Sequence, residues 1–336
     1  MTLLAVSDAD YLAVTDACGL VDRSERGKLS LTGADAKDFL QGQVSNDVRS
    51  LTPGRGCYAA FLTPKGKMLG DLRILDAGLA PPDGASGLTA TAPGRAGAVQ
   101  VLLLDTERIA LQELFNMIRR FSLGYDVTLH KRTLQTGLLS LVGPRAREVS
   151  GLAELPAAED AHILTAIAGL AVRAVRTDVG IDLLCEAGDT DALAAAMAAR
   201  GATPVSAATA DCVRIERGRP RYGIDLDDTV IPQEADLNHR AVSFTKGCYV
   251  GQETVARLYY KGKPNRHLRG LRFSKPVAPG TELQLGERLA GVLGSSVLSP
   301  VFGPIGLALL RREAEPGMTV AADDSPATVV ELPFSA

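Results

Sequence analysis

The chain has 336 residues and a net charge of −3; 46% of its residues are hydrophobic and 22% are charged. This length predicts about two domains, or three small ones. The balanced charge gives no support to a nucleic-acid-binding surface, which would need clustered Lys and Arg. No uncharged apolar run reaches about 18 residues, so no membrane span is expected. The first residues lack a basic start and include Asp8 and Asp10, which argues against a secretory signal.

The cysteines and histidines bear on redox state and metal binding. An odd number of cysteines without a C-x-x-C pair, in a chain without a signal peptide, predicts reduced thiols and a cytoplasmic protein. The four histidines lie far apart, so a complete metal site within this chain is not expected. A metal cluster bound by Cys248 together with ligands from outside the chain remains an open alternative. The cysteines are Cys18, Cys57, Cys185, Cys212 and Cys248.

The first half of the chain predicts two related units of strand, glycine turn and helix. These are Leu29 to Ala36 and Leu139 to Ala146, although so short a pattern also recurs by chance. In the first unit, Thr32 and Asp35 have the spacing of a helix cap. The segment between the units predicts a small α+β domain inserted within another. Its expected elements are strands at 57–63, 68–75, 99–104 and 127–130, a loop at 76–87, and a helix with Leu111, Leu114, Phe115 and Ile118 on one face.

The second half begins in the same manner and then changes character. Strands are expected at 170–175 and 181–185, and helices at 191–200 and from the capping residue Ser206 to Glu216. From Leu268 onward, short apolar runs are separated by Gly and Pro. That spacing is typical of a small β-barrel or sandwich.

The most informative segment runs from Lys246 to Glu253, KGCYVGQE. It places Cys248 two residues after a lysine, where a loop is expected to become a helix, and both features stabilise a thiolate. Gly247 and Gly251 leave the backbone around the sulfur open to approach. The thiolate could act as a nucleophile, a redox thiol or a metal ligand. The alternative is a structural turn in which the cysteine is incidental.

Other polar residues give weaker signals. Residues 225–234 carry four carboxylates, which on composition form a solvated acidic loop, although a ligand with several N–H donors, such as a pterin, would also suit them. A single aspartate late in an apolar strand, such as Asp71, is more often a turn group than a ligand. Arg214, within an expected helix, is by default a surface arginine.

These segments together resemble one family. KGCYVGQE matches at all eight positions the signature K-G-C-[FY]-x-G-Q-E of the YgfZ-type folate-binding proteins. These proteins are relatives of the glycine-cleavage T-protein, an aminomethyltransferase, and are linked to iron–sulfur cluster assembly or repair. The likeness covers most of the chain. It also includes Leu31 to Val48, Tyr58 to Leu72, Arg214 to Asp225, Ile231 to Leu237 and Thr254 to Leu268.

The resemblance implies an α+β fold of three domains in a cloverleaf around a central channel, two of them ferredoxin-like and the last a small β-barrel. The expected divisions are 1–50 and 134–240 for the first domain, 51–133 for the inserted domain, 241–265 for the cysteine-bearing linker and 266–336 for the barrel. The predicted repeat, insertion and β-rich tail agree with this arrangement.

The resemblance also implies tetrahydrofolate or a derivative in the channel. Asp71 falls where the T-protein has its aspartate near the reactive end of the folate. Asp182 falls where the T-protein has a glutamate that holds the pterin, and Arg214 matches the arginine of its L-R-L-E-x-G helix. A carboxylate can accept paired hydrogen bonds from pterin N–H groups, and an arginine can bind a carboxylate tail. The shorter Asp182 is a departure from the family pattern.

The resemblance favours an accessory protein for iron–sulfur clusters over a true aminomethyltransferase. In this interpretation Cys248 is the reactive thiol, Lys246 lowers its pKa, and client iron–sulfur proteins are the partners. One alternative is a folate-dependent aminomethyl or one-carbon transferase, which the retained Asp71 supports. Another is a binding module that senses folate, with Cys248 as a packing residue.

Overall fold

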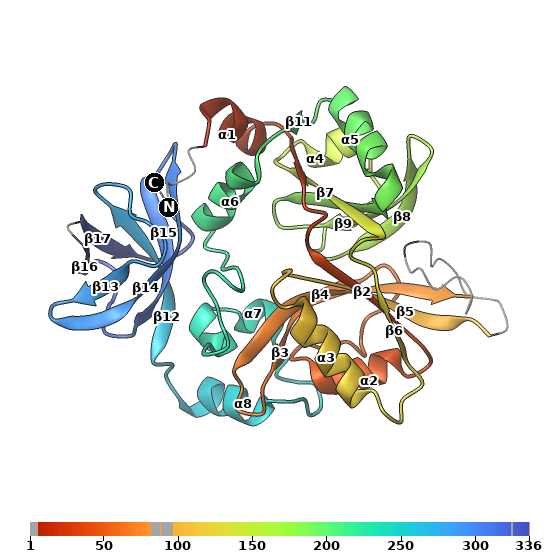
Figure 1. Ribbon diagram of the computed structural model, residues 1–336, viewed down its shortest axis with the longest axis horizontal. Helices are drawn as coiled ribbons and strands as arrows, with labels where there is room; N and C mark the ends of the chain where they lie inside the picture. Colours follow the sequence, from red (N-terminus) through yellow and green to blue (C-terminus); the bar gives the residue numbers. More distant parts are fainter. Residues whose placement is uncertain (1–5, 82–87, 89–96, 324, 336) are drawn as a thin grey trace.

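The computed structural model describes residues 6–81, 88, 97–323 and 325–335, and it contains three lobes arranged around a centre (Figure 1). Two lobes are α+β units built on sheets that are antiparallel except for one short parallel strand pair, and the third is a closed β-barrel. This arrangement confirms the predicted α+β class with a small C-terminal barrel.

The first lobe is built on a six-stranded sheet in the order β11-β1-β7-β10-β9-β8. Two helices, α4 (Ala146–Ser150) and α5 (Thr190–Ala199), cover one face of it and bury Val149, Leu193 and Met197. Its strands are β1 (Gly19–Asp22), β7 (Thr136–Val142), β8 (His162–Ile167), β9 (Leu170–Arg176), β10 (Gly180–Glu186) and β11 (Thr203–Pro204), with a short 3-10 helix η2 (Ala187–Asp189) before α5.

The second lobe is built on a five-stranded sheet in the order β3-β4-β5-β2-β6. The helices α2 (Ala36–Gln43) and α3 (Leu111–Phe121) pack on it through Phe39, Leu114 and Ile118. The strand expected at 68–75 continues to Ala80, so part of the expected loop at 76–87 is strand, and residues 82–87 lie outside the described part of the chain. The strands are β2 (Gly27–Thr32), β3 (Gly56–Leu62), β4 (Met68–Ala80), β5 (Val99–Thr106) and β6 (Thr128–Lys131).

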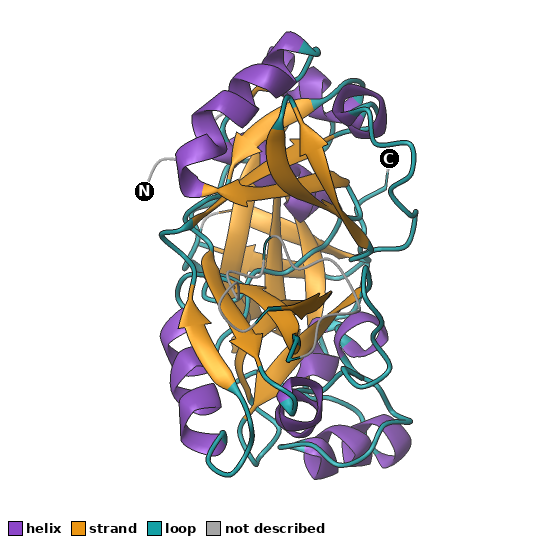
Figure 2. Cartoon of the chain, turned by 90° about the vertical axis from the view of Figure 1, so that its right-hand side faces the viewer, coloured by secondary structure: helices purple, strands orange, loops and turns teal. Residues whose placement is uncertain are grey.

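The two sheets pack against each other on the faces that the helices leave free. Leu75 and Leu103 of the second lobe contact Leu138 and Leu184 of the first in one buried cluster. Figure 2 shows the strands of the two lobes in the middle and the helices outside. Because each fully buried leucine contributes about 1.5–3 kcal/mol, this shared core joins the lobes firmly.

The chain crosses between the two lobes earlier than the sequence suggested. We expected residues 1–50 to belong to one domain, but β1 joins the first sheet and β2 joins the second. In β2, Leu29 to Thr32 pair with both β5 and β6. All six residues of β2 are buried. A strand buried on both faces has no alternation to show which sheet it joins, so the crossing between Asp22 and Gly27 was not visible in the sequence.

The two predicted units of strand, glycine turn and helix are present. Gly33 follows β2 with φ 131° and Gly143 follows β7 with φ 126°. A Cβ on Gly33 would lie 2.0 Å from the carbonyl oxygen of Asp126, so this turn requires glycine. The expected helix cap is absent, because no side chain caps the start of α2 and the Asp35 carboxylate instead accepts from the backbone N–H of Asp126.

The remaining helices join the α+β lobes to the barrel. They are α1 (Asp8–Thr15), α6 (Ala207–Glu216), α7 (Asn238–Ala241), α8 (Gln252–Lys261) and the 3-10 helix η3 (Pro232–Ala235). As predicted, the hydroxyl of Ser206 caps α6 by accepting from the N–H of Thr209 at 3.2 Å. Tyr11 of α1 and Ile215 of α6 pack against the barrel.

The barrel closes in the order β12-β15-β14-β13-β16-β17. Its strands are β12 (Arg266–Phe273), β13 (Glu282–Leu285), β14 (Arg288–Ser299), β15 (Gly303–Arg311), β16 (Thr319–Ala322) and β17 (Ser325–Val330). In the described part of the chain, no helix combines the length and the apolar character needed to cross a membrane.

Candidate functional site

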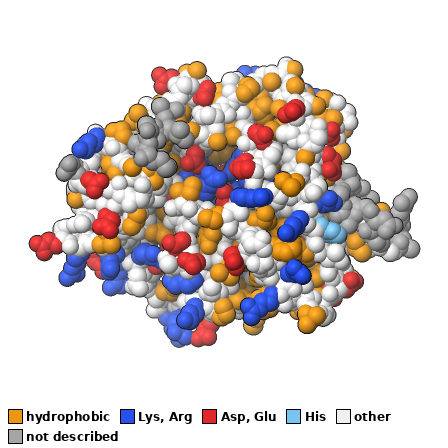
Figure 3. Space-filling model, in the orientation of Figure 1, with side chains coloured by type: hydrophobic (Ala, Val, Ile, Leu, Met, Phe, Trp, Pro, Cys, Tyr) orange, Lys and Arg blue, Asp and Glu red, His pale blue; other side chains and the backbone are white. Residues whose placement is uncertain are grey.

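A polar cavity lies where the lobes meet. It has a volume of about 290 Å³. It adjoins a smaller chamber of about 180 Å³, and the two share Arg23, Arg26, Tyr58 and Arg240. Figure 3 shows a hollow at the centre of the molecule where basic and acidic side chains gather. We call the two spaces the central cavity and the inner chamber.

A larger and more open groove of about 920 Å³ lies between the barrel and the segment that begins at Gly223. Its walls include exposed apolar side chains, such as Ile224 and Leu289, and the ion pair of Arg266 with Glu234. The titratable groups with the strongest signs of function line the central cavity and the inner chamber instead, so we place the candidate site there.

Asp71, in β4, lines the central cavity. The hydroxyl of Tyr58 in β3 donates a hydrogen bond of 2.7 Å to its Oδ2. Burial raises the pKa of Asp71 to about 6, and the bond from Tyr58 opposes the rise. Burial and the charge of Asp71 raise the pKa of Tyr58, so its hydroxyl keeps its proton. A carboxyl with a pKa near 6 can take up or release a proton close to neutral pH.

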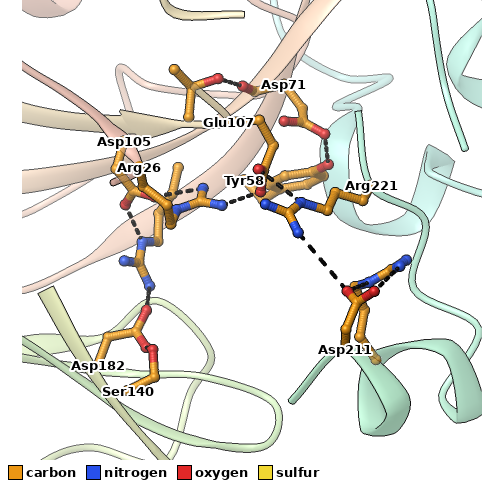
Figure 4. Close-up of polar contacts among 12 residues, drawn as sticks. Arg26, Tyr58, Asp71, Asp105, Glu107, Ser140, Asp182, Asp211 and Arg221 are labelled. Atoms are coloured by element: carbon orange, nitrogen blue, oxygen red, sulfur yellow. Dashed lines mark hydrogen bonds and ion pairs between the residues drawn. The ribbon is translucent and has the colours of Figure 1, made fainter. Parts of the chain in front are cut away.

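A chain of alternating charges runs along the cavity wall and connects the lobes (Figure 4). At its centre, Asp105 accepts from Arg73 at 2.6 Å and from Arg26 at 2.8 Å. Burial alone would raise the pKa of Asp105, but the two guanidinium groups outweigh it and lower the pKa to about 2. Removing one partner of such a pair leaves a costly lone charge, so the chain of charges fixes the cavity wall. In order, it comprises Asp182, Arg73, Asp105, Arg26, Glu107, Arg221 and Asp211.

Asp182, in β10, lines the inner chamber. The hydroxyl of Ser140 donates to its Oδ1 at 2.6 Å, and Arg73 donates to its Oδ2 at 2.8 Å. Both oxygens therefore already serve contacts within the protein. Its expected role as the carboxylate that holds a pterin stays a prediction, and these two contacts weaken it.

Arg214 lies in α6 and lines the central cavity, but its guanidinium is fully used. Its five N–H groups go to Asp211, which takes two, to the carbonyl of Arg219, to Asp225 and to Ser295 in the barrel. No donor is left for the carboxylate tail of a ligand. These contacts hold α6 against the barrel and weaken the expected role of Arg214 in binding a ligand carboxylate, which stays a prediction.

Cys248 and Lys246 lie away from the central cavity, in the loop before α8. The Cys248 side chain is exposed, whereas the other cysteines are buried or half-buried. The helix α8 begins at Gln252 after Gly251, which has φ 86°, so the thiol precedes the helix by four residues. The Lys246 ammonium donates to the carbonyls of Gln41, Val44 and Asn46 at 2.6–2.8 Å.

These three bonds use all the protons of the Lys246 ammonium. Burial lowers the pKa of Lys246 to about 8, and its three carbonyl acceptors favour the charged form. The contacts show an anchor for the loop. The proposed influence of Lys246 on the Cys248 thiol stays a prediction.

Several cavity residues were missed in the sequence. Tyr58, Arg26, Glu107, Arg221 and Asp105 build the walls, and none of them stood out alone. A usable signal was present in the sequence: Asp71 and Arg73 lie two residues apart in β4, and Glu107 follows Asp105 by two residues, just past the end of β5. Residues at that spacing share one face of a strand. Arg23 and Asp160 also line the inner chamber, and neither of them stood out in the sequence.

Comparisons with known proteins identify the family of this chain. The GCVT N-terminal domain matches residues 3–81, which include Asp71. An aminomethyltransferase of Frankia alni is 30% identical, covering 97% of this chain and 88% of the relative. The chain belongs to the aminomethyltransferase family. A further family relative, the "putative transferase At1g60990, chloroplastic" of Arabidopsis thaliana, is 27% identical and covers 94% of this chain and 71% of its own length.

A solved aminomethyltransferase structure shares the fold. The glycine cleavage system aminomethyltransferase T from Bartonella henselae superposes with a TM-score of 0.81, covering 99% of this chain and 91% of that one, at 21% identity. At that identity the likeness shows the fold alone. Among the described residues, no group of three His, Cys, Asp or Glu side chains could hold a metal ion.

Proposed function

We propose that this family member binds tetrahydrofolate or a derivative in the central cavity and transfers a one-carbon unit, with Asp71 as the proton-exchanging group. The observation that carries the proposal is the Asp71 carboxyl, which is buried, lines the cavity and has a pKa of about 6. A structural carboxylate in an ion pair would have a lowered pKa, as Asp105 does.

The cavity suits the chemistry of a reduced folate. Its wall includes the apolar side chains of Val21, Val142 and Val179 beside carboxylates and guanidinium groups, a combination that fits a flat heterocycle with polar edges. At the rim, Arg217 and Arg219 share the single carboxylate of Asp178. These two arginines, and not Arg214, have N–H donors to offer to the carboxylates of a folate tail.

The residues around Asp71 have separate roles in the proposed reaction. When bound, the folate supplies the nitrogen that receives the one-carbon unit. Tyr58 holds Asp71 Oδ2 by its hydrogen bond, and Asp71 Oδ1 receives no hydrogen bond from the described residues. Asp71 can therefore exchange a proton through Oδ1. Arg26 and Arg221 both bind Glu107 and keep this second buried carboxylate ionised beside the site.

Asp71→Asn tests the assignment, because it keeps the shape and removes the titrating group. We expect one-carbon transfer to tetrahydrofolate from an aminomethyl donor, followed by ammonia release, to fall at least about 100-fold. Binding of 5-formyltetrahydrofolate should change only a few-fold. Asp38→Asn, at an exposed carboxylate paired with Arg49, is the matched control. Transfer by Asp71→Asn at the wild-type rate, or none by the wild type, contradicts the proposal.

A second candidate function is assembly or repair of iron–sulfur clusters through Cys248, with client iron–sulfur proteins in the cytoplasm as partners. The observation that favours it is an exposed thiol on a loop that Lys246 anchors. The match of Lys246 to Glu253 to the YgfZ-type signature supports it as well. The family relatives found by comparison are named as transferases, so we rank this function second.

The two functions separate in cells that lack the endogenous gene. Wild type, Cys248→Ala and Asp71→Asn are supplied at equal levels, and one [4Fe–4S] enzyme is assayed. If the thiol acts, only Cys248→Ala fails to restore the enzyme. Equal recovery with all three variants removes the iron–sulfur candidate, and failure of Asp71→Asn alone assigns any cluster effect to the folate site.

A further inference from the structure

Two charged side chains in the inner chamber have no hydrogen-bond or ion-pair partner among the described residues. Asp160 is 8% exposed, and its carboxyl accepts no hydrogen bond and forms no ion pair within the described residues. Arg23 lines both spaces, and its guanidinium likewise has no hydrogen bond or ion pair with any described residue. An unpaired buried charge is costly, which makes Asp160, with the half-buried Arg23 in the same chamber, a candidate ligand site.

The backbone holds Asp160 in an uncommon conformation. Its φ is 61°, and it is the buried one among the four non-glycine residues with positive φ in the described chain. Its N–H donates to the carbonyl of Arg176 at 2.9 Å. Its carbonyl lies so close to Gly56 of the other lobe that a Cβ there would approach to 2.8 Å. Both lobes therefore fix Asp160 in place, and such local strain often accompanies function.

The carboxylate that the family resemblance points to is less available. Asp182 already accepts from Ser140 and Arg73. Asp160 lies in the loop before β8 and faces the same chamber with both oxygens unused by the described residues. A ligand edge that presents two adjacent N–H donors beside a carbonyl acceptor would satisfy Asp160 and Arg23 together.

We propose that Asp160 accepts the two adjacent N–H groups of the 2-amino-4-oxo edge of the pterin ring, and that Arg23 donates to the neighbouring carbonyl. This inference rests on the proposed function and adds a specificity-determining residue to it. The 2-amino group distinguishes a pterin from the corresponding 2,4-dioxo ring, lumazine. A carboxylate rejects the second oxygen of lumazine, so Asp160 selects the amino form.

The charge of Asp160 gives the site a pH dependence. Burial raises its pKa to about 7; Arg73 and Arg240 lower the pKa, whereas Glu159 and Asp105 raise it. Asp182 and Arg23 also face the chamber. Only the ionised carboxylate accepts both N–H groups, so pterin affinity should rise as pH increases through about 7.

Asp160→Asn is a mild change, because asparagine has the same shape and tolerates positive φ. The matched control is Asp323→Asn, at an exposed aspartate with φ 50° in the barrel. The readout is quenching of the fluorescence of pterin and of lumazine on titration with protein, between pH 5.5 and 8.5. Binding of 5-formyltetrahydrofolate is measured in parallel by calorimetry.

Wild type and Asp323→Asn should bind pterin at least about tenfold more tightly than lumazine at pH 8. Asp160→Asn should lose this preference, since its amide can donate to the second oxygen, and should lose the rise in affinity near pH 7. An Asp71→Asn variant should keep the rise in pterin affinity near pH 7, which separates the titration of Asp160 from that of Asp71.

The outcomes distinguish this inference from the proposed function. If 5-formyltetrahydrofolate binds and Asp160→Asn leaves the pterin preference unchanged, the folate site stands and the role of Asp160 is refuted. If pterin shows the Asp160 effect but 5-formyltetrahydrofolate does not bind, the chamber stands and the proposed function falls. If the wild type binds neither probe, both are refuted.

Discussion

The two interpretations of Lys246 are separated by the variant Lys246→Met. The sequence suggests that the lysine tunes the Cys248 thiol, whereas the structure shows its ammonium bound to three backbone carbonyls. Methionine keeps much of the length and the apolar stem but cannot donate. The three carbonyls then lose their charged donor.

The expected loss follows from those bonds. Each hydrogen bond contributes about 1 kcal/mol net, and more when one partner is charged. Three bonds therefore contribute about 3–4 kcal/mol, from which the cost of burying the ammonium must be subtracted. We expect Lys246→Met to lower the free energy of unfolding by about 2–3 kcal/mol. Lys67→Met is the control, because Lys67 donates to a single carbonyl, that of Thr229, and should cost under about 1 kcal/mol.

The assay is urea denaturation, read as a change in midpoint at constant slope. The alkylation rate of the native protein is measured alongside, and Cys248 dominates it because the other thiols are buried or half-buried. If Lys246 only anchors the loop, Lys246→Met leaves alkylation unchanged or faster. A loss of stability no larger than that of Lys67→Met, together with slower alkylation, would refute the anchor and support the tuning role.

Three further predictions concern backbone space and pH. Gly33→Ala places a Cβ 2.0 Å from a carbonyl oxygen and should lower the free energy of unfolding by at least about 2 kcal/mol. Gly42→Ala lies in open space on α2 and should raise it by up to about 1 kcal/mol. Urea denaturation measures both variants, and equal effects would contradict the close contact at Gly33. Asp105, with its pKa lowered to about 2, stabilises the protein above its unfolded pKa. About 2 kcal/mol should therefore disappear as pH falls from about 4 to 2, and Asp105→Asn should lack this component. Asp160, with its pKa raised to about 7, should destabilise the unliganded protein as pH rises from about 4 to 7. Asp160→Asn should then be more stable than wild type at pH 8 by up to about 4 kcal/mol and equal at pH 4; parallel melting curves across pH would exclude a buried titrating Asp160.

Much of the architecture could be predicted because its signals are local. The apolar face of α3, the hairpin of β3 and β4, the cap at Ser206 and the glycine turns at Gly33 and Gly143 depend on neighbouring residues. The assignment of β2 to its sheet could not be predicted, because pairing between residues as distant as Gly27 and Thr106 leaves no mark on a strand buried on both faces.

Of the candidate site, likewise, one part could be predicted from the sequence and the rest could not. Asp71 could be reached through family resemblance. The use of all five guanidinium N–H groups of Arg214 could not be predicted, because their partners come from three separate segments. Asp160 gave no signal at all, since its position depends on contacts with Arg176 and Gly56 that only the packed lobes create. Whether a charged side chain is paired is a property of the tertiary structure.

The central claim is that the cavity between the lobes holds a reduced folate. Calorimetric titration with 5-formyltetrahydrofolate at pH 7 tests it on wild type, on Ala207→Trp, which fills the cavity from the start of α6, and on Ala198→Trp, a control on the exposed side of α5. The account predicts one folate per chain for wild type and control, and binding at least about tenfold weaker for Ala207→Trp. No binding by the wild type, or equal binding by Ala207→Trp, would contradict it.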